Sequence, residues 1–158
     1  MTLSTLTRRA VLLLAAALAS VALIAADPTA RPAHAAACAG TTGVTVVVDF
    51  TAFGGSVDTR CALGDPATGL EALEDAGFVI TGTQRWGKAF ICRVDGLPLP
   101  AAEACVNTPP ASAYWSYWHA APGGTWSYST SGATSYNPAP GSVEGWAFGS
   151  GGQPTVAP

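Results

Sequence analysis

Hydrophobic and polar residues alternate along residues 43–50, and this period of two predicts a β-strand with one buried face. The residues that would share the buried face are Val44, Val46, Val48 and Phe50. The next segment, residues 51–64, contains a Gly-Gly turn signal and too little pattern for a further assignment. The pattern therefore defines the first strand well and leaves the segment after it open.

Five further strands are predicted from short runs of β-branched and aromatic residues that lie between turn signals. They cover residues 78–84, 89–96, 112–120, 125–130 and 142–148. The strand at 112–120 carries large rings on both faces, so we expect it to be central and covered on each side. The strand at 125–130 alternates rings with small polar residues, which is typical of a half-buried antiparallel strand.

One helix is predicted, over residues 65–77. Asp65 can cap its first turn, Pro66 suits the first helical position, and Gly77 ends it. The apolar residues that would point inward are Ala67, Leu70 and Leu73. A single short helix among several strands predicts the α+β class.

Residues 1–35 have the composition of a secretory signal. Arg8 and Arg9 precede an uncharged apolar run over residues 11–26. A polar, Pro-containing stretch follows, with small residues at Ala35 and Ala37. This order predicts cleavage after Ala35 or Ala37, with retention as an anchor as the alternative. The arginine pair fits both Sec and twin-arginine export, so we expect a secreted, extracellular protein without fixing the route.

The expected mature protein is one domain, residues 36–148, followed by a flexible tail without a core residue, residues 149–158. From residue 36 onward the chain has four basic and nine acidic residues, which gives a net charge of −5. No basic patch is available for phosphates, so nucleic acid and anionic lipid are poor candidate partners. No second apolar run could span a bilayer, and we expect a monomer.

Four cysteines remain after cleavage, and an even number in an exported domain predicts two disulfides. Three pairings are possible. We favour Cys38–Cys61 and Cys92–Cys105, because each closes a local loop beside a predicted strand. No C-x-x-C pair occurs, so we expect no metal site. A lipid-attachment box at Cys38 is the less favoured alternative.

Catalytic chemistry has little support in the residues. His119 is the one histidine after cleavage, and it has no partner that the sequence reveals. The nucleophile elbow, the zinc-protease motif and a phosphate-binding glycine loop do not occur. We therefore expect a protein that is not an enzyme.

The segment 113–130 holds three Trp and three Tyr. One short helix offers too little apolar surface to cover all of these rings, so we expect some to line a groove or an exposed face. Two alternatives stay open for the exposed set. They are Trp115, Tyr117, Trp126 and Tyr128 on one face, or Tyr114 and Trp118 on the other.

Three stretches, VTVVVDF, GLEALEDAGF and the aromatic region through GWAF, resemble the carboxy-terminal domain of transcobalamin and intrinsic factor. The positions that carry this resemblance are Trp115, Trp118, Trp126, Gly132, Gly141 and Trp146-Ala147-Phe148. The resemblance implies a β-grasp-like, mixed or antiparallel sheet crossed by one helix. It also implies a domain that clasps one face of a corrinoid while a second protein completes the site.

These observations predict a secreted, non-catalytic domain that binds a flat amphipathic small molecule, with cobalamin as a possible ligand and no bound cofactor. The expected ligand-binding residues are Trp115, Tyr117, Trp118, Trp126 and Trp146. A protein- or glycan-adhesion module at the cell surface is the alternative function, and an enzyme ranks third.

Overall fold

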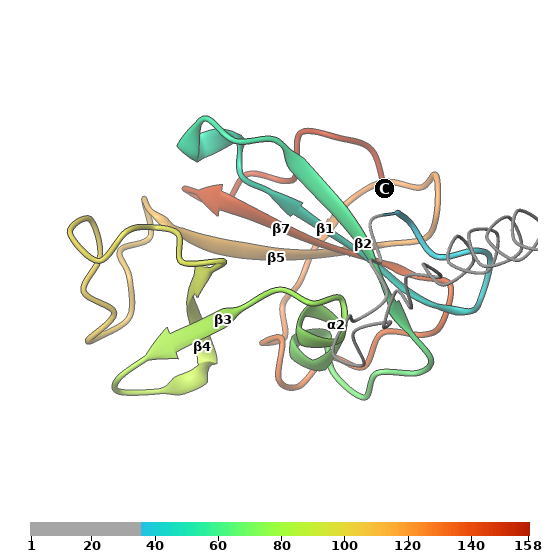
Figure 1. Ribbon diagram of the computed structural model, residues 1–158, viewed down its shortest axis with the longest axis horizontal. Helices are drawn as coiled ribbons and strands as arrows, with labels where there is room; N and C mark the ends of the chain where they lie inside the picture. The colour runs from blue at the N-terminus through green and yellow to red at the C-terminus, as the bar shows by residue number, and fades with distance from the viewer. Residues whose placement is uncertain (1–35) are drawn as a thin grey trace, which may run out of the picture. The chain divides into compact units, whose positions relative to one another are not determined.

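The structure is a computed structural model that describes residues 36–158 (Figure 1). The expected export signal, residues 1–35, lies outside the described residues. The elements are β1 (Gly43–Asp49), the 3₁₀-helix η1 (Thr51–Phe53), β2 (Val57–Leu63), α2 (Gly69–Asp75), β3 (Ile80–Thr83), β4 (Gly87–Val94), β5 (Tyr114–Ala120), β6 (Ser127–Tyr128) and β7 (Val143–Gly149). No helix within residues 36–158 is long and apolar enough to cross a membrane.

The strands form a five-stranded sheet in the order β2-β1-β7-β5-β6, beside a separate β3-β4 hairpin. β1 and β7 run parallel in the middle of the large sheet, and the other neighbours are antiparallel. α2 packs against one face of this sheet (Figure 1). The predicted α+β class with a mixed, β-grasp-like sheet and one crossing helix is therefore confirmed.

α2 begins later than predicted. Its N-cap is Thr68, whose hydroxyl accepts a hydrogen bond from the Glu71 amide at 3.0 Å, while the Glu71 carboxylate accepts one from the Ala67 amide at 2.9 Å. This reciprocal pair is a form of capping box, and it is a stronger start signal than Asp65, which is exposed. The prediction of Asp65 as the cap and of Ala67 as an inward residue was wrong. Leu73 is fully buried, as predicted.

Two strands differ from expectation. β2 was not predicted, because its central residues Asp58 and Arg60 form an ion pair at the edge of the sheet and break the hydrophobic alternation. β6 has only two residues where six were predicted. Before β6, Trp126 is buried on the outer face, where its indole N–H donates to the Val156 carbonyl at 2.8 Å. After β6, the Ser129 amide still donates to the Tyr117 carbonyl at 2.9 Å, and the Ser129 hydroxyl donates to the Ser131 carbonyl at 2.8 Å, which turns the chain away.

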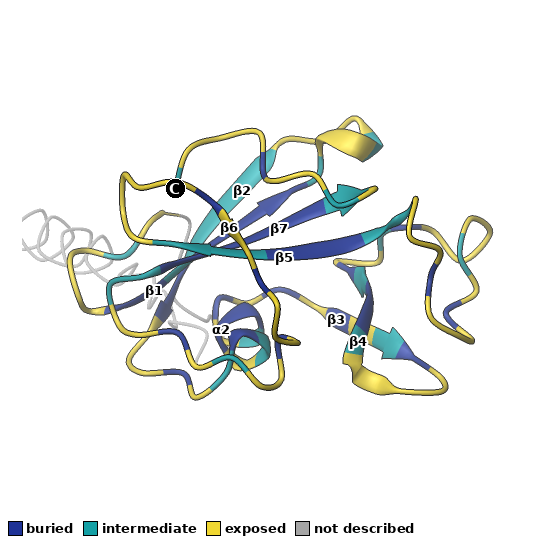
Figure 2. Cartoon of the chain, turned by 180° about the vertical axis from the view of Figure 1, so that it is seen from behind, coloured by how far each residue is buried: buried dark blue, intermediate teal, exposed yellow. Residues whose placement is uncertain are grey.

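The inner face of the sheet, which faces α2 and the hairpin, carries the main core. Its fully buried members include Val44, Val46, Val48, Leu73, Val94 and Trp146. Figure 2 shows β1, β5 and β7 buried along their middle, whereas β6 and the start of β4 are exposed, as are most of the loops. The face predicted for the first strand therefore packs in the main core.

The outer face is covered by residues 150–158, which we call the C-terminal strap. Ser116 donates to the Gly152 carbonyl at 2.8 Å, and both the amide and the hydroxyl of Thr155 donate to the Asp49 carboxylate. Pro154 is fully buried against the sheet. The expectation of a tail without a core residue was therefore wrong, because turn-forming residues here pack flat on a sheet.

Both predicted disulfides are present. Cys38–Cys61 joins the start of the domain to β2, and Cys92–Cys105 joins β4 to the loop that follows it. No cysteine of the described chain is free. Disulfides persist in oxidising compartments, so this pattern is typical of a protein outside the cytoplasm.

Candidate functional site

A cavity of about 290 Å³ lies between β4, β5 and the segment that follows β6. We call it the aromatic groove. It is lined by Ala89, Phe90, Ile91, Tyr114, Trp115, Tyr117, Tyr128, Ser129, Thr130, Ser131, Gly132, Ala133 and Trp146. Its volume is at the lower end of the range for small-molecule sites.

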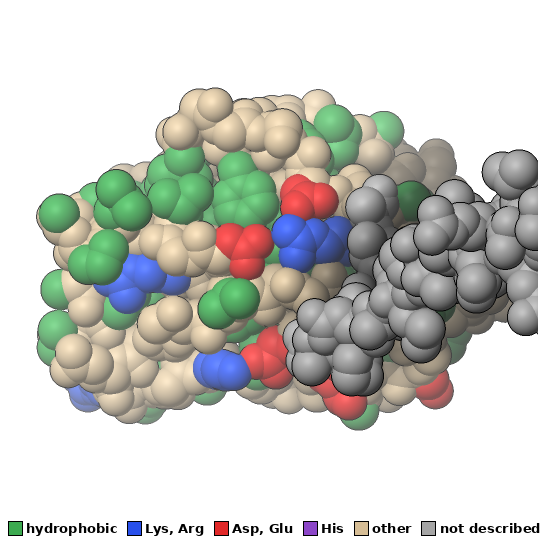
Figure 3. Space-filling view, in the orientation of Figure 1, with side chains coloured by type: hydrophobic (Ala, Val, Ile, Leu, Met, Phe, Trp, Pro, Cys, Tyr) green, Lys and Arg blue, Asp and Glu red, His purple; other side chains and the backbone are tan. Residues whose placement is uncertain are grey.

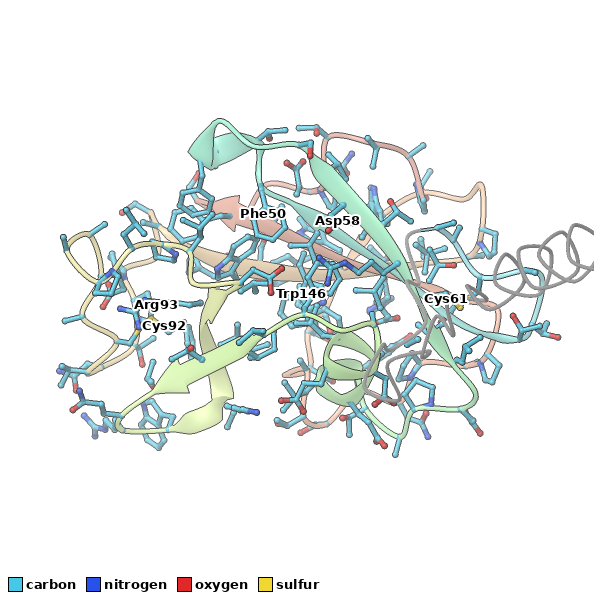
Figure 4. All side chains as sticks on the ribbon, viewed as in Figure 1. Phe50, Asp58, Cys61, Cys92, Arg93 and Trp146 are labelled. Carbon is cyan, nitrogen blue, oxygen red and sulfur yellow. A yellow bond between two sulfur atoms is a disulfide. The ribbon has the colours of Figure 1, made fainter. Side chains whose placement is uncertain are left out.

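The floor of the aromatic groove consists of three rings from neighbouring strands. Tyr117 and Trp146 are paired across β5 and β7, and their rings stack with centroids 4.5 Å apart. Trp115 lies beside them, and its indole N–H donates to the Leu97 carbonyl at 3.1 Å. Figure 4 shows Trp146 in the interior, on the side of the sheet that faces α2. Because most of each ring is buried, the floor is rigid.

Two tyrosines border the aromatic groove, and their side chains lie on the outer face of the sheet, together with Trp118 and the C-terminal strap. Tyr128 is 48% exposed, and its hydroxyl lies 3.2 Å from that of the half-buried Tyr114. The Trp118 ring meets the Tyr128 ring edge to face, with centroids 5.1 Å apart. Thr130 and Ser131, which are exposed and line the groove, supply polar side chains at its edge. The groove thus has an apolar floor and a polar rim.

The structure brings three of the five predicted ligand-binding residues together in the groove: Trp115, Tyr117 and Trp146. Trp118 and Trp126 do not line it, because they lie on the outer face with the second hydrophobic cluster. Trp126 is buried and donates to the Val156 carbonyl of the strap at 2.8 Å. The strap, whose position sequence alone did not reveal, accounts for the burial of Trp126.

Sequence reasoning missed most of the groove wall. Tyr114 and Tyr128 were recognised only as alternatives from opposite faces, whereas both border the groove and their hydroxyls meet on the outer face of the sheet. Residues 89–91 of β4 carry no chemical signal, because they are ordinary strand residues that only tertiary packing places beside β5.

Charge is absent from the groove lining. Figure 3 shows basic side chains beside acidic ones on one face, and two of the four basic residues in residues 36–158 form ion pairs, Arg60 with Asp58 and Lys88 with Glu74. These pairs leave no extended basic field. The groove lining therefore favours an uncharged ligand over an ionic one.

A buried acid lies behind the floor. The Tyr117 hydroxyl donates to one oxygen of the Glu144 carboxyl, whose side chain is completely buried and whose other oxygen has no partner. Burial raises the pKa of Glu144 to about 8, and the hydrogen bond from Tyr117 offsets part of that effect. Burial, and then the neighbouring Glu144, raise the pKa of Tyr117.

The Tyr117 hydroxyl faces the helix. A Cβ atom on Gly69, at the start of α2, would lie 2.1 Å from the Tyr117 hydroxyl oxygen. Only glycine can occupy this position without a shift of the phenol. The acid and phenol pair therefore supports the floor from behind, and its polar atoms point away from the groove.

A second, shallower cavity of about 460 Å³ opens beside His119, whose ring stacks on Tyr136 with centroids 4.4 Å apart. In the described chain, the one group with metal-ligand geometry is Cys92, Glu103 and Cys105. Its cysteines are joined in a disulfide, so they are not thiolate ligands.

A family model described as an SCO2322-like domain matches residues 107–157, which is less than half of the chain. The matched region spans β5, β6, β7 and most of the strap, and it includes most of the groove floor and rim. No curated protein and no solved structure matches the chain. None of these comparisons relates the chain to transcobalamin or intrinsic factor.

Proposed function

We propose that this protein is an exported, non-catalytic domain that binds a flat, uncharged, amphipathic small molecule in the aromatic groove. The observation that carries the proposal is a solvent-open cavity with a floor of three rings and no charged residue in its lining. Flat apolar rings stack well on such a floor, and they lose little entropy because the floor is rigid.

The size of the cavity limits the ligand. A volume of about 290 Å³ suits a molecule of two or three fused rings. A corrinoid is larger, so it would have to lie across the mouth, with a second protein covering its other face. The proposal therefore favours a ligand smaller than a corrinoid, and cobalamin is included among the compounds that are tested for binding.

Export is the expected setting of this function. Two disulfides stabilise the domain, and residues 1–35 have the order of regions expected of a secretory signal. We infer a monomer that needs no bound cofactor.

The proposal is tested by titrating 2-naphthol, riboflavin, cyanocobalamin and a cello-oligosaccharide into residues 36–158 by calorimetry. The matched variants are Thr130→Phe and Thr134→Phe, because both positions are exposed in the same loop and only Thr130 lines the groove. We expect Thr130→Phe to weaken a flat ligand roughly tenfold or more, because its ring takes up the ligand's volume. No binding by any flat probe, or equal effects of both variants, would refute the proposal.

An adhesion function is the second candidate, and one observation favours it. β6 pairs with β5 at Trp118 and His119, and the Ser129 amide donates to the Tyr117 carbonyl at 2.9 Å, so only residues 114–116 of that β5 edge lack a partner strand. An extended peptide could add there as a strand, with its side chains in the aromatic groove. Binding of peptides but of no flat probe would support this function instead.

A further inference from the structure

The second cavity, of about 460 Å³, shares no lining residue with the aromatic groove. We call it the hydroxyl cavity, because His119 and the hydroxyl residues Thr125, Ser127 and Ser142 line it. His119 and Ser127 are paired across β5 and β6, so their side chains lie on the same face of the sheet. That face is the inner one, because His119 follows Tyr117 by two residues in the same strand.

One wall of the hydroxyl cavity is a fixed pair of rings. The His119 ring stacks on the Tyr136 ring with centroids 4.4 Å apart, and the Tyr136 ring meets the Tyr117 ring edge to face at 6.0 Å. The Tyr136 carbonyl accepts a hydrogen bond from the Gly69 amide at 2.9 Å, which ties this segment to the start of α2. Groups held in this way meet a ligand at little entropic cost.

The side chains of the hydroxyl cavity have unused hydrogen-bonding capacity. Those of His119, Thr125, Ser127 and Ser142 form no hydrogen bond to another residue of the described chain. Nδ1 of His119 and Oγ of Ser142 are moreover buried, and buried polar atoms in folded proteins are almost always paired. A hydroxyl and a neutral imidazole each offer one donor and also accept. The cavity therefore presents several donors and acceptors within one small volume.

The composition of the lining limits the class of ligand. It contains no Asp, Glu, Lys or Arg, so an anion would find no cationic partner there. A metal ion would find His119 as the one nitrogen ligand among the lining side chains. A flat hydrocarbon ring would leave the free donors and acceptors unpaired. The ligand that fits is neutral and carries several hydroxyls close together.

We propose that the hydroxyl cavity is a second binding site, which takes one or two rings of a neutral saccharide. The volume lies within the range of small-molecule sites. Sugar hydroxyls donate to and accept from His119 and Ser142, while the C–H face of the sugar ring packs on the apolar turn at Ala121 and Pro122. This site is separate from the aromatic groove, so the inference does not rest on the proposed function.

The test is an NMR titration of ¹⁵N-labelled residues 36–158 with cellobiose and maltose, and with sodium sulfate as the anionic probe. We expect the two disaccharides to shift amides in residues 119–127 and 136–142, on the two sides of the hydroxyl cavity. Ser142→Ala should raise the dissociation constant of the bound saccharide about 2- to 10-fold, as for the loss of one hydrogen bond. Its free energy of unfolding in urea should not fall, because the Ser142 hydroxyl has no partner in the described chain. Ser135→Ala is the matched control, since Ser135 is exposed and lines neither cavity.

A second pair of variants fills the cavity. Thr125 and Thr134 are both exposed, and only Thr125 lines the hydroxyl cavity. We expect Thr125→Trp to weaken saccharide binding roughly tenfold or more, because the indole takes up the volume of the sugar ring. Thr134→Trp should leave binding unchanged.

Three results would overturn the saccharide site. They are no amide shifts with either disaccharide at tens of millimolar, shifts confined to the aromatic groove, and equal effects of Thr125→Trp and Thr134→Trp. Shifts of the cavity amides with sulfate and with neither sugar would overturn the class of ligand. Binding of 2-naphthol in the aromatic groove is measured separately, so failure of the saccharide site and failure of the proposed function are distinguishable.

Discussion

The stability of the domain should fall as the pH rises, because of Glu144. Its carboxyl is fully buried on the inner face, where it faces Tyr117, His119 and Tyr136 and has a hydrogen bond to Tyr117 alone. Burial disfavours the charged form and raises the pKa of Glu144 to about 8. The perturbation that tests this is Glu144→Gln, which keeps an acceptor for the phenol and removes the ionisation.

The size of the effect follows from proton linkage. Between pH 4.5, the ordinary pKa of the group, and about 8, the folded protein binds one proton that the unfolded chain has lost. The stabilising contribution is complete below 4.5 and is lost as the pH rises through about 8. At about 1.4 kcal/mol per pH unit, the free energy of unfolding falls by about 5 kcal/mol across this window. Ionisation of Asp49 does not contribute to the stability change in this pH window. Desolvation raises the pKa of Asp49, but hydrogen bonds from Thr155 and Thr51 outweigh it and lower the pKa below the ordinary value. The stability that the Asp49 carboxylate contributes is therefore lost only at pH values below the window.

The assay is urea unfolding, followed by circular dichroism, at intervals between about pH 5 and about pH 8.5. We expect the wild type to lose several kcal/mol over this range relative to Glu144→Gln, and the two proteins to be similar at the acidic end. Glu74→Gln is the control, because Glu74 is partly exposed and pairs with Lys88 at the surface. Parallel curves for the wild type and Glu144→Gln would refute the reasoning.

Two further predictions concern packing and cross-links. Gly145→Ala should lower the free energy of unfolding in urea by about 1–3 kcal/mol, because the new Cβ would lie 2.6 Å from the Trp126 ring. The control Gly132→Ala, whose Cβ would have no neighbour nearer than 4.0 Å, should change that free energy by less than about 0.5 kcal/mol. Equal stabilities of the two variants would contradict the packing of the outer face. Replacing Cys92 and Cys105 by serine should cost about 3 kcal/mol, since the bridge closes a loop with a sequence separation of 13, and an unchanged melting temperature would contradict this.

The first strand and both disulfides could be predicted because their signals are local. Val44, Val46 and Val48 alternate without interruption, and each cysteine pair closes a short loop. β2 could not be predicted, because an edge strand tolerates polar residues such as Arg60 on its inner side and loses the alternation. The helix cap was visible in principle, since Thr68 and Glu71 have the spacing of a capping box.

The candidate site could be predicted only in part. The argument that one short helix cannot cover all the rings holds for Tyr128, which is exposed, but the strap covers Trp126 from the other side. A segment rich in Gly and Pro resembles a flexible tail in composition, and nothing local reveals that Pro154 packs on a sheet. The position of β4 beside the floor likewise depends on long-range packing, which no local pattern encodes.

The most direct test of the groove as a ligand site is an NMR titration of ¹⁵N-labelled residues 36–158 with 2-naphthol. The account predicts that amide shifts concentrate in residues 89–91 and 128–133, on the two sides of the aromatic groove. Shifts confined to the second cavity, around His119 and Ser142, or no shifts at saturating probe, would contradict it.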